Sequence, residues 1–326
     1  MDTTVLHCLM NIDFSEVQTH DNMTVCPIHS QINSGPEYIT LGEAIEKGIL
    51  TIKELNQGGS VPNLAAINSS DIPILLLDGE EVTGAKQNRI LNTTILLKER
   101  SETVIPVSCT EHGRWHYTSD RFDDSDVVLA CSIRSKKNRS VNQSLINGRS
   151  YESNQSEVWN EISDLHESAG VSSPTGAMKD TFNDRGNDIS AYLDSFPLIS
   201  EQKGLFVFIN GKPVGFDYIS FNPAYSKVHM KLLKSYAISA LIMKRKNDIK
   251  PDALAAKAFI ESLKRSTEHA YDSLGYGIDH RFEAMKSVGS ALVYDGTVIH
   301  TAFFRTRSAR TSDNMSSSKR RTGFRI

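Results

Sequence analysis

Side chains able to do acid–base and ligand-binding chemistry gather between Ile74 and Trp115. Three glutamates could act as general acids or bases on a glycosidic or phosphoester bond: Glu80, Glu81 and Glu111. Six further residues supply cations, amides and an aromatic ring for binding: Lys86, Gln87, Asn88, Arg89, Arg114 and Trp115. A strand that only fills a core alternates apolar and simple polar residues, and this stretch does not. We therefore expect a ligand-binding site here.

The residue types in this stretch suit a ligand that carries phosphates and a base. Three cations could together hold a diphosphate: Lys86, Arg89 and Arg114. Gln87 and Asn88 could hydrogen-bond a base or ribose edge, and Trp115 could stack on the base. A structural explanation stays open, in which the glutamates flank an exposed hairpin turn at Asp78-Gly79 and the polar run from 86 to 89 is a sheet face or an internal salt-bridge network.

Two segments carry a resemblance to a known family. The first, from Ile74 to Thr93, is ILLLDGEEVTGAKQNRILNT, and the second, from Ile105 to Trp115, is IPVSCTEHGRW. Together they resemble the ARG and rhodanese-phosphatase-associated protein domain. Residues 38–50, 235–237 and 289–291 extend this resemblance over roughly 13–304. The family's association with ADP-ribosylglycohydrolases, rhodaneses and phosphatases implies a role in NAD- or ADP-ribose-related pathways.

The resemblance implies binding or hydrolytic processing of an ADP-ribose-like or NAD-derived nucleotide. A first alternative is a non-catalytic module that binds a protein partner. A second is a zinc-binding structural domain, because five residues have metal-like spacing: Cys26, His29, Cys109, His112 and His116. The main hypothesis includes no metal and no cofactor. Cys109 and Arg114 match the Cys-x4-Arg spacing of a rhodanese loop, but no helix pattern follows them, so we expect a buried, inert Cys109.

Composition limits the remaining classes of function. The 326 residues are 39% hydrophobic and 23% charged, with a net charge of -3, which is typical of a globular protein without a general attraction for nucleic acid or anionic membrane. No signal-peptide pattern and no apolar run long enough for a membrane span are present. Four scattered cysteines favour free thiols. We expect a cytoplasmic protein.

Local patterns predict an α+β fold, with an antiparallel β-rich first half over 1–133 packed with a helical second half over 157–304. Short strands are expected in the first half, after a capping box at Thr40 and Glu43. Asx-Gly turns predict two further hairpins, over 204–220 and 289–304. Residues 134–156, rich in Ser, Asn and basic side chains, are expected to form a surface loop. We expect a single α+β unit over 1–304.

The C-terminal segment and one glycine-rich stretch also allow structural predictions. Seven basic residues and one acid lie in 305–326, which predicts a disordered basic tail and the one place where nucleic acid could bind. The glycine-rich stretch 275–281 lacks the flanking pattern of a phosphate-binding loop and is expected to be a helix C-cap followed by a loop. Its Asp279 and Arg281 could pair across a cleft with the 74–93 segment.

Overall fold

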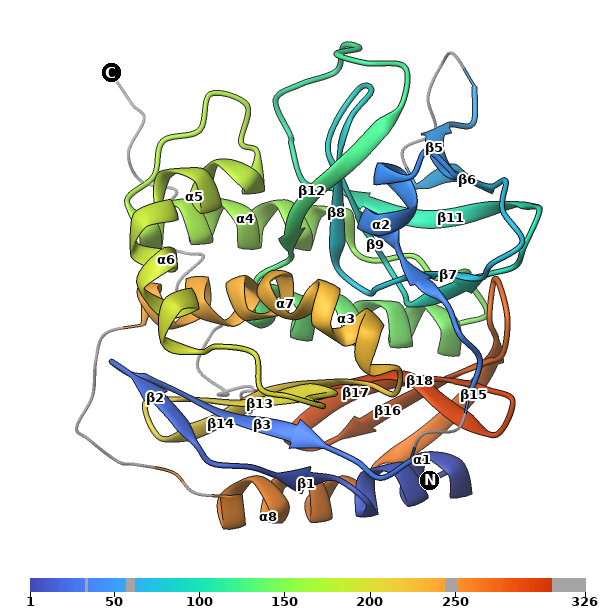
Figure 1. The fold of residues 1–326 in the computed structure, drawn as a ribbon. Helices are drawn as coiled ribbons and strands as arrows, with labels where there is room; N and C mark the ends of the chain where they lie inside the picture. The colour runs from blue at the N-terminus through green and yellow to red at the C-terminus, as the bar shows by residue number, and fades with distance from the viewer. Residues whose placement is uncertain (33–34, 57–61, 244–250, 252, 307–326) are drawn as a thin grey trace.

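The fold joins a large antiparallel sheet to a small barrel (Figure 1). The structure is a computed structural model, which describes residues 1–32, 35–56, 62–243, 251 and 253–306. The described residues form eight helices and 18 strands, and the predicted α+β class is confirmed. Every strand pair is antiparallel except β4 with β7. None of the helices within the described ranges is both long and apolar enough to span a membrane.

The large sheet has nine strands drawn from both halves of the chain. Its order is β1 (Asp13–Phe14), β3 (Met23–His29), β13 (Gly204–Ile209), β14 (Lys212–Ile219), β18 (Thr297–Arg305), β17 (Ser287–Tyr294), β16 (Ile278–Ala284) and β15 (Thr267–Asp272), with β2 (Gln18–His20) paired to β3. The two predicted hairpins are therefore β13–β14 and β17–β18. Positive φ angles at Asn210, Gly211, Asp295 and Gly296 match the tight turns that Asx-Gly pairs favour.

Helices cover both faces of this sheet. In Figure 1, α3 (Cys131–Ile146) and α7 (Asn222–Ile242) lie over one face, and α1 (Thr3–Met10) and α8 (Ala253–Leu263) lie under the other. Successive side chains of β13 point to opposite faces of the sheet, so this one strand packs against the helices on both sides. Leu205 and Val207 pack in the cluster with α7, whereas Phe206 and Phe208 pack in the cluster with α1 and α8.

The barrel stands on the far side of α3 and α7 from the sheet (Figure 1). It closes in the order β11 (Ser101–Cys109), β6 (Asn63–Asn68), β5 (Leu50–Glu54), β12 (Phe122–Val128), β8 (Glu80–Gly84) and β9 (Arg89–Leu91). Buried aliphatic residues such as Ile52, Leu64 and Val82 fill it. Beside it lies a small sheet of β10 (Ile95–Leu97), β7 (Ile74–Leu76) and β4 (Ile39–Thr40). The predicted capping box begins the adjoining α2 (Leu41–Glu46).

A third layer of helices flanks the barrel. It consists of α4 (Gln155–Ala169), α5 (Met178–Asp184) and α6 (Gly186–Ser195). Helix α4 ends at Gly170, which has a left-handed φ of 66°. Apolar residues of these helices, among them Ile162 and Phe182, form one core with Ile133 of α3 and Ile238 of α7. The helical second half that the sequence predicts is thus present.

The prediction of a surface loop over 134–156 is wrong. Most of that segment is helix α3, and α4 begins at Gln155. The polar composition of α3 led to this wrong prediction, because three polar side chains of the helix are buried: Arg134, Lys137 and Asn138. Burial of such groups is tolerated where ion pairs and hydrogen bonds compensate for the loss of water. Here Arg134 pairs with Asp217 of β14 over 2.7 Å.

The expected hairpin at Asp78-Gly79 is also wrong. Strand β7 before the turn pairs with β10 and β4, whereas β8 after it pairs with β12 and β9. The chain therefore crosses from the small sheet into the barrel at this point. One further segment differs: the 275–281 glycines follow strand β15 instead of a helix. Arg305 is the last residue of β18, and the predicted tail from 307 onward lies outside the described residues.

Candidate functional site

The most conspicuous polar residues of the sequence lie at one end of the barrel, which we call the barrel mouth. Strands β5, β8 and β11 end there, and β9 and β12 begin there, because neighbouring strands are antiparallel. The mouth is formed by the β8–β9 connection at 85–88, the loop 110–118 after β11, and Glu54 at the end of β5. Of the nine predicted site residues, seven come to this end of the barrel, and Glu80 and Glu81 lie at the start of β8, away from the mouth.

Arg114 joins the two loops of the mouth. Its Nε donates to Glu111 Oε2 over 2.8 Å, and its terminal nitrogens donate to the Ala85 carbonyl over 2.7 Å and to Asn88 Oδ1 over 3.1 Å. The same guanidinium also donates to the carbonyl of His116. A planar fork with five N–H donors is suited to such a task. Arg114 therefore braces the mouth and has few donors left for a ligand.

Glu111 is held as an anion by this brace. Its Oε1 accepts from the Thr175 hydroxyl over 2.9 Å, and its Oε2 accepts from Arg114 and from the Asn88 backbone N–H. Burial raises the pKa of the carboxyl, but these hydrogen bonds outweigh burial and leave the pKa below its ordinary value. A carboxylate stabilised in this way is a poor proton donor.

Arg89 and Glu54 form a buried pair with unused bonding capacity. Arg89 is fully buried, and one terminal nitrogen donates to Gln87 Oε1 over 3.0 Å. The other terminal nitrogen lies 3.8 Å from Glu54 Oε1, an ion-pair distance too long for a hydrogen bond. Within the part of the chain that the structure describes, Nε and this second nitrogen of Arg89 have no hydrogen-bond partner, and neither has either carboxylate oxygen of Glu54.

An aromatic pair with a cation lies beside these buried groups. The Lys86 ammonium is 5.2 Å from the centre of the Trp115 ring and 5.1 Å from that of Tyr117, distances typical of cation–π contacts. The Arg89 guanidinium packs against the same Trp115 ring at 5.9 Å. Trp115 and Tyr117 remain 49% and 45% exposed. We call Lys86, Trp115 and Tyr117 the aromatic platform of the barrel mouth.

The remaining two glutamates are buried away from the platform. Glu80 accepts from the Lys231 ammonium of α7 over 3.1 Å and from the Leu77 N–H over 2.8 Å. Glu81 accepts from the Thr110 hydroxyl over 2.6 Å, while its other oxygen has no hydrogen-bond partner among the residues described. Burial raises the pKa of Glu81 to about 7. Neither carboxylate faces the platform.

The cysteines and the residues of the zinc hypothesis are distributed over separate sheets. Cys26 and His29 lie on β3 of the large sheet, whereas Cys109 ends β11 of the barrel. Across 1–32, 35–56, 62–243 and 253–306, no group of three potential ligands is placed to hold a metal ion. Cys109 is fully buried, and burial raises the pKa of its thiol to about 11. The expected burial of Cys109 is therefore confirmed.

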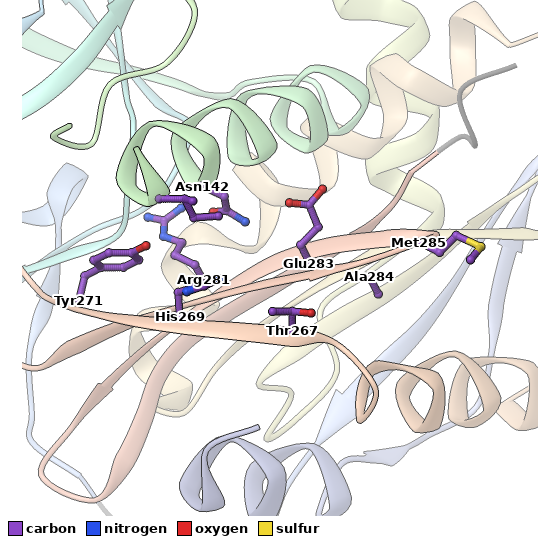
Figure 2. A pocket seen from close by; sticks show the side chains of 9 residues that line it. Asn142, Thr267, His269, Tyr271, Arg281, Glu283, Ala284 and Met285 are labelled. Carbon is purple, nitrogen blue, oxygen red and sulfur yellow. The ribbon is translucent and has the colours of Figure 1, made fainter. Parts of the chain in front are cut away.

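A second polar cluster lies around Arg281, away from the barrel mouth. Arg281 of β16 donates to Asp279 Oδ2 over 2.6 Å and to the Thr93 hydroxyl over 2.6 Å, so the predicted pairing with the 74–93 segment is confirmed as a buried contact. Arg281 also lines a pocket between α3, β15 and β16 (Figure 2). Sequence patterns do not indicate this pocket, because they predict a loop in place of α3 and no strand at β15.

Comparison with known proteins identifies a family for this chain. The family model of the ARG and Rhodanese-Phosphatase-superfamily-associated Protein domain matches residues 11–304, about nine-tenths of the 326 residues. The resemblance stated from the sequence is therefore confirmed. No curated protein and no solved structure matches the chain. The match covers both the barrel mouth and the pocket.

Proposed function

The chain belongs to the ARG and Rhodanese-Phosphatase-superfamily-associated Protein domain family, and from that premise we propose that it binds an ADP-ribose-like or NAD-derived nucleotide at the barrel mouth. The observation that carries the proposal is the buried Arg89–Glu54 pair, which keeps unused donors and acceptors directly beside an exposed aromatic platform. Polar groups buried without partners are costly, and a ligand that completes their bonding recovers that cost.

The parts of such a nucleotide match the parts of the mouth. A ribose hydroxyl both donates and accepts, so it can bond to a Glu54 oxygen and to an Arg89 N–H at once. A diphosphate is attracted by the Lys86 ammonium. The exposed face of Trp115 provides a stacking surface for an adenine ring. Because Arg89 is buried against Trp115, binding requires the Trp115 ring to move.

Binding without hydrolysis fits the mouth better than catalysis. Each of the three predicted acid–base residues, Glu80, Glu81 and Glu111, is at most 5% exposed and already accepts a hydrogen bond. A general acid or base must reach a substrate atom within hydrogen-bond distance. The geometry therefore supports a nucleotide-binding domain, and hydrolysis is not part of the proposal.

Calorimetric titration of the full chain with ADP-ribose, NAD and ADP tests the proposal. We expect ADP-ribose to bind, and we expect Trp115→Ala and Lys86→Ala each to weaken its binding by about tenfold or more, since each removes about 1–3 kcal/mol of stacking or ionic contact. Lys98→Ala is the matched control, because Lys98 lies 5.3 Å from the Tyr276 ring in a cation–π contact outside the mouth. Wild-type protein that binds none of the three nucleotides contradicts the proposal.

Trp115 also offers a direct spectroscopic signal. The chain has two tryptophans, so Trp159→Phe leaves Trp115 as the sole indole fluorophore. If ADP-ribose stacks on Trp115, its fluorescence is quenched in this variant with the same midpoint as in the titration. Binding of ADP-ribose without any change in Trp115 fluorescence would place the nucleotide elsewhere on the molecule.

A second candidate is the protein-interaction module, which the exposure of Trp115 and Tyr117 side by side favours. Exposed aromatic rings are enriched in the energetic centres of protein interfaces. This candidate predicts a partner whose affinity for purified protein falls in Trp115→Ala and is unaffected by saturating ADP-ribose. If ADP-ribose instead displaces the partner protein, the nucleotide and the partner bind the same surface at the barrel mouth.

A further inference from the structure

A pocket of about 440 Å³ opens between the last turns of α3 and the edge of the large sheet (Figure 2). Its volume lies within the range of small-molecule sites. Asn142 and Ile146 of α3 form one wall, and residues of β15 and β16 form the floor and the opposite wall. The pocket shares no residue with the barrel mouth.

The register of β15 and β16 determines which side chains face the pocket. Cross-strand pairing places Thr267 opposite Glu283 and His269 opposite Arg281. Side chains two residues apart share a face of a strand, so Tyr271 follows on the same side as His269. All five line the pocket, and Figure 2 shows them along the two strands below α3. The β15 members come from an edge strand of the sheet, and Tyr271 also packs against Val141 and Leu145 of α3.

The base of the pocket combines an unused donor with an unused acceptor. Arg281 is 2% exposed, and its Nε and Nη2 nitrogens both donate to Asp279. Its Nη1 nitrogen has no hydrogen-bond partner in the described part of the chain. Asn142 is also 2% exposed, and its Oδ1 likewise lacks a partner while its amide nitrogen donates to the Phe282 carbonyl. Such groups mark a place where a ligand can complete the bonding.

The formal charges around this pocket cancel. Arg281 is neutralised by the adjoining Asp279 over 2.6 Å, and at the rim Glu283 is paired with Arg139 over 3.0 Å. No formal charge of one sign therefore dominates the lining, which does not favour a phosphate or another strong anion. The ring of Tyr271 adds a flat apolar surface to an otherwise polar lining.

We propose that this pocket binds a neutral polyhydroxylated ligand, such as a monosaccharide unit. Hydroxyl groups both donate and accept, so one diol can use the Arg281 N–H and the Asn142 carbonyl oxygen together. The hydroxyl of Thr267 and the imidazole of His269 supply further hydrogen bonds along β15. The CH face of a sugar ring packs against Tyr271.

Ligand-observed NMR by saturation transfer to the full chain tests this assignment. The probes are D-ribose, D-glucose and their methyl glycosides, with methyl phosphate, whose methyl protons report binding, as the anionic comparison. We expect saturation of at least one sugar, and an affinity about tenfold lower in Tyr271→Ala and in His269→Ala, because each removes a stacking face or a hydrogen-bonding group. Both residues lie on an edge strand, where His269 is exposed and Tyr271 is half-buried. Ala270→Ser, on the opposite face of β15, is the control and should behave as wild type.

The outcomes separate this site from the barrel mouth. Saturation of methyl phosphate with no sugar signal would overturn the proposal in favour of an anion site. A sugar signal that is equal in wild type, Tyr271→Ala and His269→Ala would also overturn it, since the sugar would then bind elsewhere, and so would the absence of any sugar signal. ADP-ribose titration of Tyr271→Ala is run in parallel, because the barrel mouth retains all its residues in that variant and its result is independent of the pocket.

Discussion

The hydroxyl of Thr93 donates a hydrogen bond to Asp279 Oδ2 over 3.1 Å, although 186 positions separate the two residues in the chain. The same hydroxyl oxygen accepts from Arg281 at 2.6 Å. The last residue of the conspicuous 74–93 segment thus holds the ion pair at the base of the pocket. The same segment therefore contributes residues to both sites: Thr93 to the base of the pocket, and Lys86 and Arg89 to the barrel mouth.

Replacing Thr93 with valine should destabilise the protein. Valine keeps the shape but removes one donor and one acceptor, so Asp279 and Arg281 each lose a buried partner. We expect the free energy of unfolding to fall by about 1–3 kcal/mol, the usual result of leaving buried polar groups unsatisfied. Urea denaturation of wild type and Thr93→Val measures the change. Thr103→Val, at a half-buried position of β11, is the control and should shift stability by less than about 0.5 kcal/mol.

Replacing Arg114 with lysine should loosen the barrel mouth, because a single ammonium cannot reproduce the fork that bonds to Glu111, Ala85 and Asn88. We expect a loss of about 3 kcal/mol in unfolding free energy and faster proteolysis within 110–118. Arg100→Lys is a suitable control, since the Arg100–Asp71 pair is about 70% exposed on both sides. Unchanged proteolysis of the loop in Arg114→Lys would show that Arg114 is not its brace.

Glu81 should make stability fall with rising pH between its two pKa values. Burial raises its pKa from 4.5 to about 7 in the folded protein, so the folded state binds the proton more tightly than the unfolded chain does. Below pH 4.5 both states are protonated, and the contribution of the neutral carboxyl is fully present. As pH rises to about 7 that contribution is lost, and above this value the folded state must bury an anion.

Glu81→Gln should remove this pH dependence. The difference between the two pKa values corresponds to about 3 kcal/mol, so the variant should gain stability over wild type at pH 8 and show little gain at pH 4. Urea midpoints at several pH values test this against Glu102→Gln, an exposed position of β11. A Glu81→Gln variant whose midpoint differs from wild type by the same amount at pH 4 and pH 8 would contradict the prediction.

Several elements could be predicted because their cause is local. The Asn210-Gly211 and Asp295-Gly296 turns need only positive φ angles at adjacent residues, and the chain around them already alternates as strands do. The Thr40–Glu43 capping box depends on contacts within one turn of helix. The family itself followed from two short segments, and the family model confirms it.

Other features could not be predicted, because the partner that explains each residue is distant in the chain. Helix α3 was mistaken for a loop since Arg134 and Lys137 look like surface residues until Asp217 and Asp78 are placed beside them. Similarly, nothing near Arg114 indicates that its guanidinium is used up on backbone carbonyls from a different strand connection. Charge in a sequence shows what a residue can bind and does not show what it already binds.

The sequence by itself determined the family, the α+β class and where polar chemistry is concentrated, because these depend on residue types and on patterns within a few residues. Tertiary structure decided which of those groups have bonding capacity left. In the folded chain, Arg114 and Glu111 use their hydrogen-bonding groups on each other and on neighbouring residues. Arg89 and Arg281 keep donors without described partners, and a pocket opens beside β15. The physical reason is that desolvation and hydrogen bonding depend on three-dimensional neighbours, which only the folded chain brings together.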